Sequence, residues 1–164
     1  MKTLIYVLAT SRTGTSGLAQ ALRAIGLDAY HEKTNALPPL SRYLGDVTAG
    51  DGPPGAVHEL MAELRRHLEG DGFYADISHY LSHYFEVIED EGIPARRVYL
   101  VRDGREWVRR AMHSVIAEKA DVEHDYPYLR CCPVRGVSTF ERLCSYWAWV
   151  NGRYAVAAHQ EIID

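Results

Sequence analysis

Residues 2–22 read KTLIYVLATSRTGTSGLAQAL and contain the three parts from which the rest of the fold is inferred. Thr3 to Ala9 is an apolar, β-branched run with little alternation, which is typical of a strand buried on both faces. Small and polar residues follow from Thr10 to Gly14, and apolar residues then recur at helical spacing until Gly26 ends the helix. A buried strand, a tight turn and a helix N-terminus form a phosphate-binding loop, because the first N–H groups of the helix and its positive dipole end point into the turn.

The residues of this loop argue against ordinary ATP or GTP chemistry. A nucleotide triphosphatase carries G-x-x-x-x-G-K-[ST], with the lysine on the β- and γ-phosphates and the hydroxyl on Mg²⁺. Here Ala9 stands at the first glycine, and Thr15 stands where the lysine belongs. A cation does occur earlier in the loop, at Arg12. A tight turn that binds nothing is the alternative interpretation of this segment.

A second charged motif follows another apolar run. Residues 97–101 read RVYLV and residues 102–110 read RDGREWVRR, so a predicted strand leads directly into a basic helix. Arginine suits a phosphate because its planar guanidinium holds two oxygens at once and never loses its charge. Asp103 stands where it can cap the helix. The alternative for this segment is an amphipathic surface helix with a solvated basic face.

The two motifs resemble those of sulfotransferases that use 3′-phosphoadenylyl sulfate (PAPS). The pattern strand–[RK]-[ST]-G-T-[ST]–helix is similar to their 5′-phosphosulfate loop, and strand–R-D-[PG]-R–helix is similar to their 3′-phosphate motif. The resemblance covers nearly all of this chain, but usual members continue into another strand and a glycine-rich loop. A fragment, a compact natural variant and a protein completed by a partner chain are the explanations left open.

The resemblance implies a function and a set of site residues. The chain is expected to transfer a sulfuryl group from PAPS to a hydroxyl or amine of a small-molecule or carbohydrate acceptor, without a metal. Arg12 is expected to neutralise the leaving oxygen as adenosine 3′,5′-bisphosphate (PAP) departs. Arg102 is expected to anchor the 3′-phosphate, and Arg110 stands where family members usually place a serine for the same phosphate. The 5′-phosphosulfate loop is expected to comprise Ser11, Arg12, Thr13, Gly14, Thr15 and Ser16.

Two residues compete as the base that takes the proton of the acceptor. Glu32 follows His31 after the first helix, and bacterial sulfotransferases carry a similar G-x-x-x-x-H-E stretch in which an acidic residue can serve as base. His79 follows the predicted strand Phe73–Ser78, at the edge where parallel sheets bind ligands. A surface charge for Glu32 and an ordinary loop histidine for His31 are the alternatives, and His31 is the weaker candidate for a base.

Length, charge and cysteine content limit the class of protein. With 164 residues and a net charge of −4, the chain suits one domain, 1–164, without a general attraction for nucleic acid. No run of about 18 apolar residues predicts a membrane span. The three cysteines give no disulfide or zinc framework, which favours a reduced, cytoplasmic protein. Six of the 18 Lys and Arg lie between Arg96 and Arg110, as a small polyanionic ligand requires. The sequence leaves open whether the chain forms a homo-oligomer.

The predicted fold is a three-layer α/β domain of the kind found in P-loop NTPases and sulfotransferases. A short parallel sheet is expected from Thr3–Ala9, Phe73–Ser78 and Arg97–Val101, with helices on both faces. A polar edge strand is expected within 27–35, helices near 15–26, 56–68, 80–91 and 140–159, and long loops at 36–55 and 117–137. His79 and His83 would share a helix face, but without an evident third ligand we favour packing or active-site lining over a metal site.

Two rival functions stay open. A small-molecule kinase on the same fold would need a lysine in the loop and carboxylates placed for Mg²⁺. A non-catalytic nucleotide- or phosphate-binding module would bind PAP and transfer nothing to any acceptor.

Overall fold

The computed structural model describes residues 1–31, 55–117 and 138–160 of the chain. The expected long loops, 36–55 and 117–137, lie almost entirely outside these ranges. The elements in chain order are β1 (Thr3–Ala9), α1 (Thr15–Ala24), β2 (Ala29–Tyr30), α3 (Ala56–His67), β3 (Phe73–Asp76), the 3₁₀ helix η2 (Leu81–Tyr84), α4 (Phe85–Asp90), β4 (Ala95–Leu100), α5 (Gly104–Ala117) and α7 (Thr139–Gln160).

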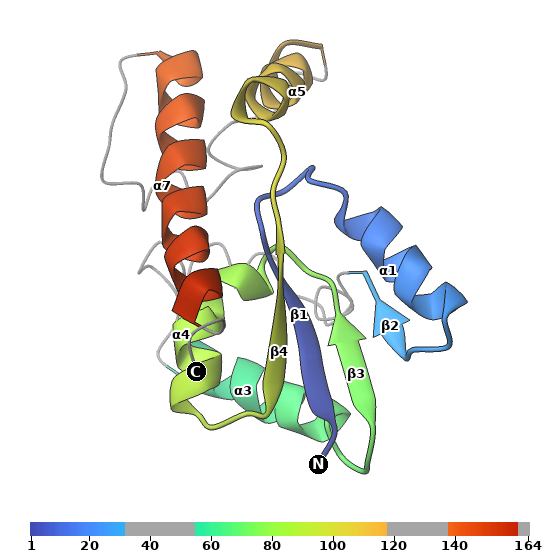
Figure 1. Cartoon of the computed structure of the whole chain (residues 1–164). Coiled ribbons are helices and arrows are strands. Elements are labelled where there is room, and N and C mark those ends of the chain that lie inside the picture. The colour runs from blue at the N-terminus through green and yellow to red at the C-terminus, as the bar shows by residue number, and fades with distance from the viewer. Residues whose placement is uncertain (32–54, 118–137, 161–164) are drawn as a thin grey trace.

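A parallel sheet lies at the centre of the fold (Figure 1). Its strands run in the order β2-β3-β1-β4, and every pair of neighbours is parallel. β1 pairs with β3 on one side and with β4 on the other, where the register ends at Ala9↔Leu100. Because parallel strands end at the same edge of a sheet, the segments that follow β1 and β4 begin side by side.

Each face of the sheet buries a different set of helices. Leu4, Tyr6 and Leu8 of β1 belong to a large apolar cluster that includes residues of α3, η2, α4, α5 and α7. Val7 and Ala9 belong to a smaller cluster that includes α1 and β3. This alternation follows the two-residue period of a strand, and it confirms the expected α/β arrangement with helices on both faces. No helix in the described ranges is long and apolar enough to cross a membrane.

Strand boundaries differ from the expected ones only at the ends. β1 has its expected bounds, β3 ends at Asp76 rather than Ser78, and β4 spans Ala95–Leu100 rather than Arg97–Val101. The expected edge strand within 27–35 is the two-residue β2, which pairs with the end of β3. So short a strand leaves too few alternating residues for its bounds to be located from sequence.

The segment expected to be helical over 80–91 is helical from Leu81 to Asp90, but it is divided into two helices. These helices are η2 and then α4, which begins at Phe85. The hydroxyl of Ser82 ties η2 to the end of β1: it donates to the Val7 carbonyl at 2.8 Å and accepts from the Ala9 N–H at 3.1 Å. His79 lies ahead of η2, so it does not share a helix face with His83. The helical spacing behind the metal interpretation is therefore absent.

Candidate functional site

The loop between β1 and α1 has an unusual backbone. Arg12 has a φ of 61°, the left-handed region that residues with a Cβ seldom adopt, and it is the single non-glycine residue of the described ranges with a positive φ. Gly14 has a φ of 109°, so a larger residue would be strained there although space is available. The Thr13 hydroxyl donates to the Thr10 carbonyl at 2.7 Å and closes the turn. Strained residues of this kind are concentrated at ligand-binding loops.

The first turn of α1 offers donors to an anion. Gly14 is the N-cap residue and supplies no side-chain hydrogen bond, and the first turn contains no acidic residue. The first backbone bond of the helix runs from the Leu18 N–H to the Gly14 carbonyl at 3.1 Å. The preceding N–H groups have no partner within the helix, as at every helix N-terminus. These N–H groups and the positive end of the helix dipole therefore lie at the turn, where they favour a negative charge.

Two buried hydroxyls at the start of the loop have no hydrogen-bond partner among the described residues. The exposed fraction is 0% for Thr10 and 9% for Ser11, and neither Oγ atom has a donor or acceptor in reach within those residues. Buried polar atoms are nearly always paired, with protein, water or ligand. The loop between β1 and α1 therefore contains two hydroxyls whose hydrogen-bonding capacity is unused among the described residues.

His31 lies at this loop, although sequence reasoning ranked it below Glu32. It follows β2, and its Nε2 lies 3.0 Å from the Thr15 Oγ1 and 3.1 Å from the Ser16 Oγ. The signal in the sequence was its place just after the second strand of the fold, but the strand is too short to be located with certainty. Glu32 lies outside the described residues, so its role as base stays a prediction.

The motif after β4 begins with the expected helix cap. One carboxylate oxygen of Asp103 accepts the N–H groups of Arg105 at 3.0 Å and Glu106 at 3.2 Å, so the predicted cap is confirmed. The guanidinium of Arg105 also donates to this carboxylate. These bonds, led by the one from the Arg105 side chain, lower the pKa of Asp103. The cap fixes the start of α5 next to the end of β4.

A buried hydrogen bond joins the two motifs. The indole N–H of Trp107 in α5 donates to the Ser11 carbonyl of the first loop at 2.6 Å. Trp107 is fully buried and packs against Tyr146 of α7, with 5.8 Å between the ring centroids. Segments far apart in the sequence are thus held in direct contact at one edge of the sheet. Sequence reasoning assigned no role to Trp107.

Four of the six cations between Arg96 and Arg110 are neutralised by neighbouring carboxylates. Arg97 pairs with Glu89 and Arg105 with Asp103. Arg109 and Arg110 both bind Glu106, at 2.9 and 2.8 Å, which lowers the pKa of Glu106 to about 2, with the bond from Arg109 as the largest cause. The basic cluster therefore carries far less net charge than the sequence suggests.

Arg102 is the exception at the end of β4. Its side chain is half-buried, and it makes no hydrogen bond or ion pair with another described residue. Arg110, the other candidate for the 3′-phosphate, is exposed and held by Glu106 in the structure. Of the two, Arg102 is the guanidinium that is available to an anion.

His79 lies after β3, the neighbour of β1. Its exposed fraction is 7%, and its ring packs on Tyr80 with 4.0 Å between centroids. Ser78 is also buried and accepts the Tyr80 N–H at 3.2 Å. Nearby, burial lowers the pKa of His83 to about 3, so the ring of His83 is neutral. His79 thus lies at the carboxyl edge of the sheet as expected, while its role as base stays a prediction.

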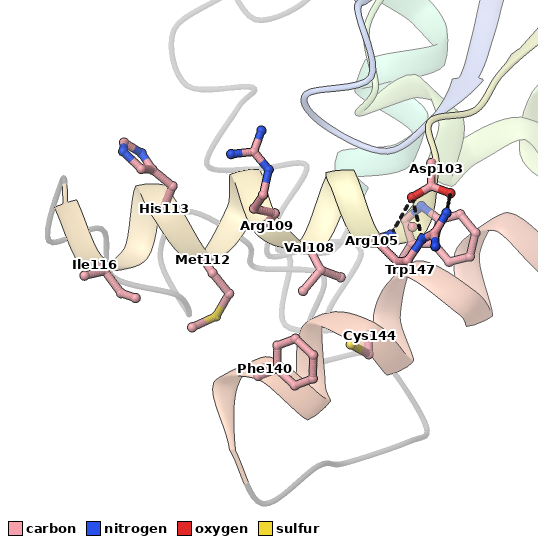
Figure 2. Close-up of a pocket in the computed structure, with 11 residues that line it drawn as sticks. Asp103, Arg105, Val108, Arg109, Met112, His113, Ile116, Phe140, Cys144 and Trp147 are labelled. Carbon is pink, nitrogen blue, oxygen red and sulfur yellow. Dashed lines mark hydrogen bonds and ion pairs between the residues drawn. The ribbon is translucent and has the colours of Figure 1, made fainter.

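A cavity of about 900 Å³ lies between α5 and α7 (Figure 2). Val108 and Met112 of α5 extend toward Phe140 and Cys144 of α7, so its walls are mainly apolar. Gly104 stands at one end, where a Cβ atom would lie 2.9 Å from the Trp147 ring. A side chain at this position would push the two helices apart, so the close approach requires glycine.

No protein-family model matches the chain, and no curated protein matches it. The two loops and the contacts between them are therefore the features of the chain that bear on its function.

Proposed function

We propose that this protein is a sulfotransferase that moves the sulfuryl group of PAPS to a hydroxyl or amine of a small-molecule or carbohydrate acceptor. The observation that carries the proposal is the Trp107–Ser11 hydrogen bond, which holds the loop between β1 and α1 against the helix of the second arginine motif. A donor with phosphate groups at its 5′ and 3′ positions needs two such points at one edge of a sheet. The P-loop-like character of the fold is part of this proposal.

The first loop would hold the 5′-phosphosulfate. N–H groups of Gly14, Thr15 and Ser16 are suited to the phosphate, because a helix N-terminus favours negative charge. Ser11 and Thr13 belong to the same loop, where the Ser11 hydroxyl has no partner among the described residues. Arg12 is exposed at the tip of the turn, where its charge can stabilise the oxygen that leaves the sulfur.

The second motif would hold the 3′-phosphate. Arg102 supports this role because its half-buried guanidinium makes no ion pair within the described residues. Binding energy from this remote phosphate would align the donor for reaction. Arg110 would contribute only if Glu106 released it, since its Nε–H donates to that carboxylate at 2.8 Å.

The proposed reaction is a single in-line transfer. The acceptor oxygen or nitrogen forms a bond to sulfur while the bond from sulfur to the bridging oxygen breaks. The electron pair of that bond stays on the 5′-phosphate of PAP, and the acceptor proton passes to a base. His79 or Glu32 would be this base, and His79 lies after β3 at the same edge of the sheet. The step requires no metal, since Arg12 supplies the positive charge.

Thermal unfolding with PAP, AMP or Mg-ATP tests the proposal first. A ligand present at about 100 times its Kd adds about 2.7 kcal/mol of stability, which raises the Tm of a domain of this size by several degrees. We expect PAP to raise the Tm well beyond AMP, without metal. A shift with Mg-ATP alone would favour the kinase, and no shift with any nucleotide would contradict the proposal.

Transfer then separates an enzyme from a binding module. Incubation with PAPS labelled in its sulfur and a panel of phenols, sugars and amines should give a labelled product and PAP. Binding of PAP without transfer to any acceptor would favour the non-catalytic nucleotide-binding module.

A further inference from the structure

The ring of His31 is placed to control the hydroxyl groups of the proposed 5′-phosphosulfate loop. One atom, Nε2, lies within hydrogen-bond distance of both the Thr15 Oγ1, at 3.0 Å, and the Ser16 Oγ, at 3.1 Å. Both hydroxyls belong to the first turn of α1, beside the helix N–H groups that an anion would use. His31 itself follows β2, so the outer strand of the sheet delivers the ring to the loop.

The protonation state of this nitrogen decides what the two hydroxyls can do. Each hydroxyl has one hydrogen to donate, and a neutral imidazole nitrogen without hydrogen accepts such a hydrogen. A hydroxyl that donates to His31 cannot donate the same hydrogen to an anion. In the imidazolium both ring nitrogens carry hydrogen, so Nε2 donates to the hydroxyl oxygens and leaves their hydrogens for a ligand.

The charge of the ring acts in the same direction. An anion in the loop favours the protonated form of a nearby histidine, and the protonated ring in turn strengthens the hydrogen bonds to the anion. Histidine is the side chain whose ordinary titration falls between about pH 5 and 8. Binding of the anion would therefore take up one proton from solvent and form an N–H bond at Nε2.

We propose that His31 is a positioning residue that binds the anionic 5′-phosphosulfate group through the Thr15 and Ser16 hydroxyls, and that it does so in its protonated form. The proposal rests on the proposed function, because it assigns the ligand class of the same loop. It makes donor affinity depend on pH, with tighter binding at lower pH. This role differs from that of a base, which would require the ring to be neutral before reaction.

The contribution of His31 to the pH dependence of binding must be distinguished from the contributions of other charged and titratable groups near the ring. The charged and titratable groups on the elements around it, within the described ranges, are Arg12 in the loop, Arg23 in α1, Asp28 before β2, Tyr30 in β2, and Tyr74, Asp76 and His79 on or after β3. His79 is the other histidine of this set. The variant His79→Gln is therefore the matched control for pH dependence.

Adenosine 5′-phosphosulfate is the suitable probe. It carries the phosphosulfate group, which stays fully ionised where histidine titrates, and it lacks the 3′-phosphate. PAP is unsuitable for this purpose, because its own phosphates change charge near about pH 6. Calorimetric titration of the full chain between about pH 5.5 and 8.5 would give the Kd and, from buffers of different ionisation heat, the number of protons taken up.

The proposal predicts a distinct result for each variant. The wild-type protein should bind the probe about tenfold more tightly at the low end of this pH range than at its high end. His31→Gln places a permanent N–H near the position of Nε2, so binding should be retained and nearly independent of pH. His31→Phe keeps a ring without the donor and should lose about tenfold in affinity at low pH. His79→Gln should keep the pH dependence of the natural protein.

A second measurement needs no substitution. In protein labelled with ¹⁵N at histidine, addition of the probe near neutral pH should convert the His31 ring to the doubly protonated form, visible in its nitrogen shifts. A neutral His31 ring in the complex would overturn the proposal even if the variants fail to fold. So would pH dependence that persists in His31→Gln or disappears in His79→Gln.

The outcomes separate this inference from the function on which it rests. If PAP binds and the affinity for the probe does not change with pH, the role of His31 is wrong and the sulfotransferase proposal stands. If neither ligand binds at any pH, the proposed function is wrong and the role of His31 falls with it.

Discussion

In the loop after β1, polar groups remain without partners among the described residues, whereas in α5 after β4 nearly every charge is already paired. The Thr10 and Ser11 hydroxyls are buried and unsatisfied within the described residues. In the second motif, by contrast, Asp103 and Glu106 bind three of the arginines on α5. The number of basic residues therefore overstates the positive charge that the second motif has available for a ligand. Within this motif, the half-buried Arg102 is the arginine that remains available.

This difference has a physical cause. Carboxylates placed three or four residues from arginines on a helix form ion pairs with them, as Glu106 does with Arg109 and Arg110. The loop between β1 and α1 contains no carboxylate that could pair with donors in the same way. A ligand must therefore compete with carboxylates for the arginines of α5, whereas the backbone N–H groups of the first turn of α1 have no partner within the helix. Four substitutions test this contrast.

Arg12→Ala should have the largest effect. If Arg12 stabilises the charge that develops on the leaving oxygen, turnover should fall by about 10²–10³-fold, while the Kd for PAP should change by less than about tenfold. Turnover of PAPS and calorimetric binding of PAP measure the two quantities. Arg23→Ala, at an exposed position in the last turn of α1, is the control. Equal losses of binding and rate would show that Arg12 only anchors the donor.

Arg102→Ala should weaken binding of PAP by about tenfold to a hundredfold, since a hydrogen-bonded charge pair contributes about 1.5–3 kcal/mol. The affinity for AMP, which lacks the 3′-phosphate, should fall much less in the same variant. Arg110→Ala is the matched comparison within the same motif, and its loss should stay below about threefold because Glu106 already holds that side chain. A larger loss of PAP affinity in Arg110→Ala than in Arg102→Ala would contradict the assignment of the 3′-phosphate to Arg102.

Trp107→Phe tests the contact between the loops. The change keeps an aromatic ring but removes the donor to the buried Ser11 carbonyl, so the free energy of unfolding should fall by about 1–3 kcal/mol. Urea denaturation measures this loss, and PAP binding should weaken with it. The control is Trp147→Phe, because the indole N–H of Trp147 has no acceptor among the described residues. Similar losses for both variants would mean that the Ser11 bond has no special role.

Glu106→Gln should have the smallest effect. It removes the carboxylate that holds Arg109 and Arg110, so binding of PAP should tighten, by no more than about threefold. The gain should disappear when Arg110→Ala is added, which a double-mutant cycle on the Kd would show. Tighter binding that persists in the double variant would indicate a general change of charge rather than the release of Arg110.

Several parts of the fold were predictable because they follow from local periodicity. The buried run Thr3–Ala9 and the helices near 15–26 and 56–68 appear where the sequence placed them. The cap by Asp103 was likewise predictable, because a cap depends on residues adjacent in the chain. The division of the helical segment 80–91 into η2 and α4 was not predicted, and in η2 the Ser82 hydroxyl binds backbone groups of β1 that lie far away in the sequence.

The candidate site shows the same limit. Residue types and spacing alone indicated an anion-binding turn after the first strand and a second arginine motif after a later one. Three features of the site depended on tertiary structure. They are the set of arginines that carboxylates neutralise, the histidine that reaches the turn and the side chain that joins the two loops. The physical reason is that local sequence sets backbone conformation within a few residues, whereas hydrogen bonds and ion pairs between distant segments depend on how the sheet brings its strand ends together.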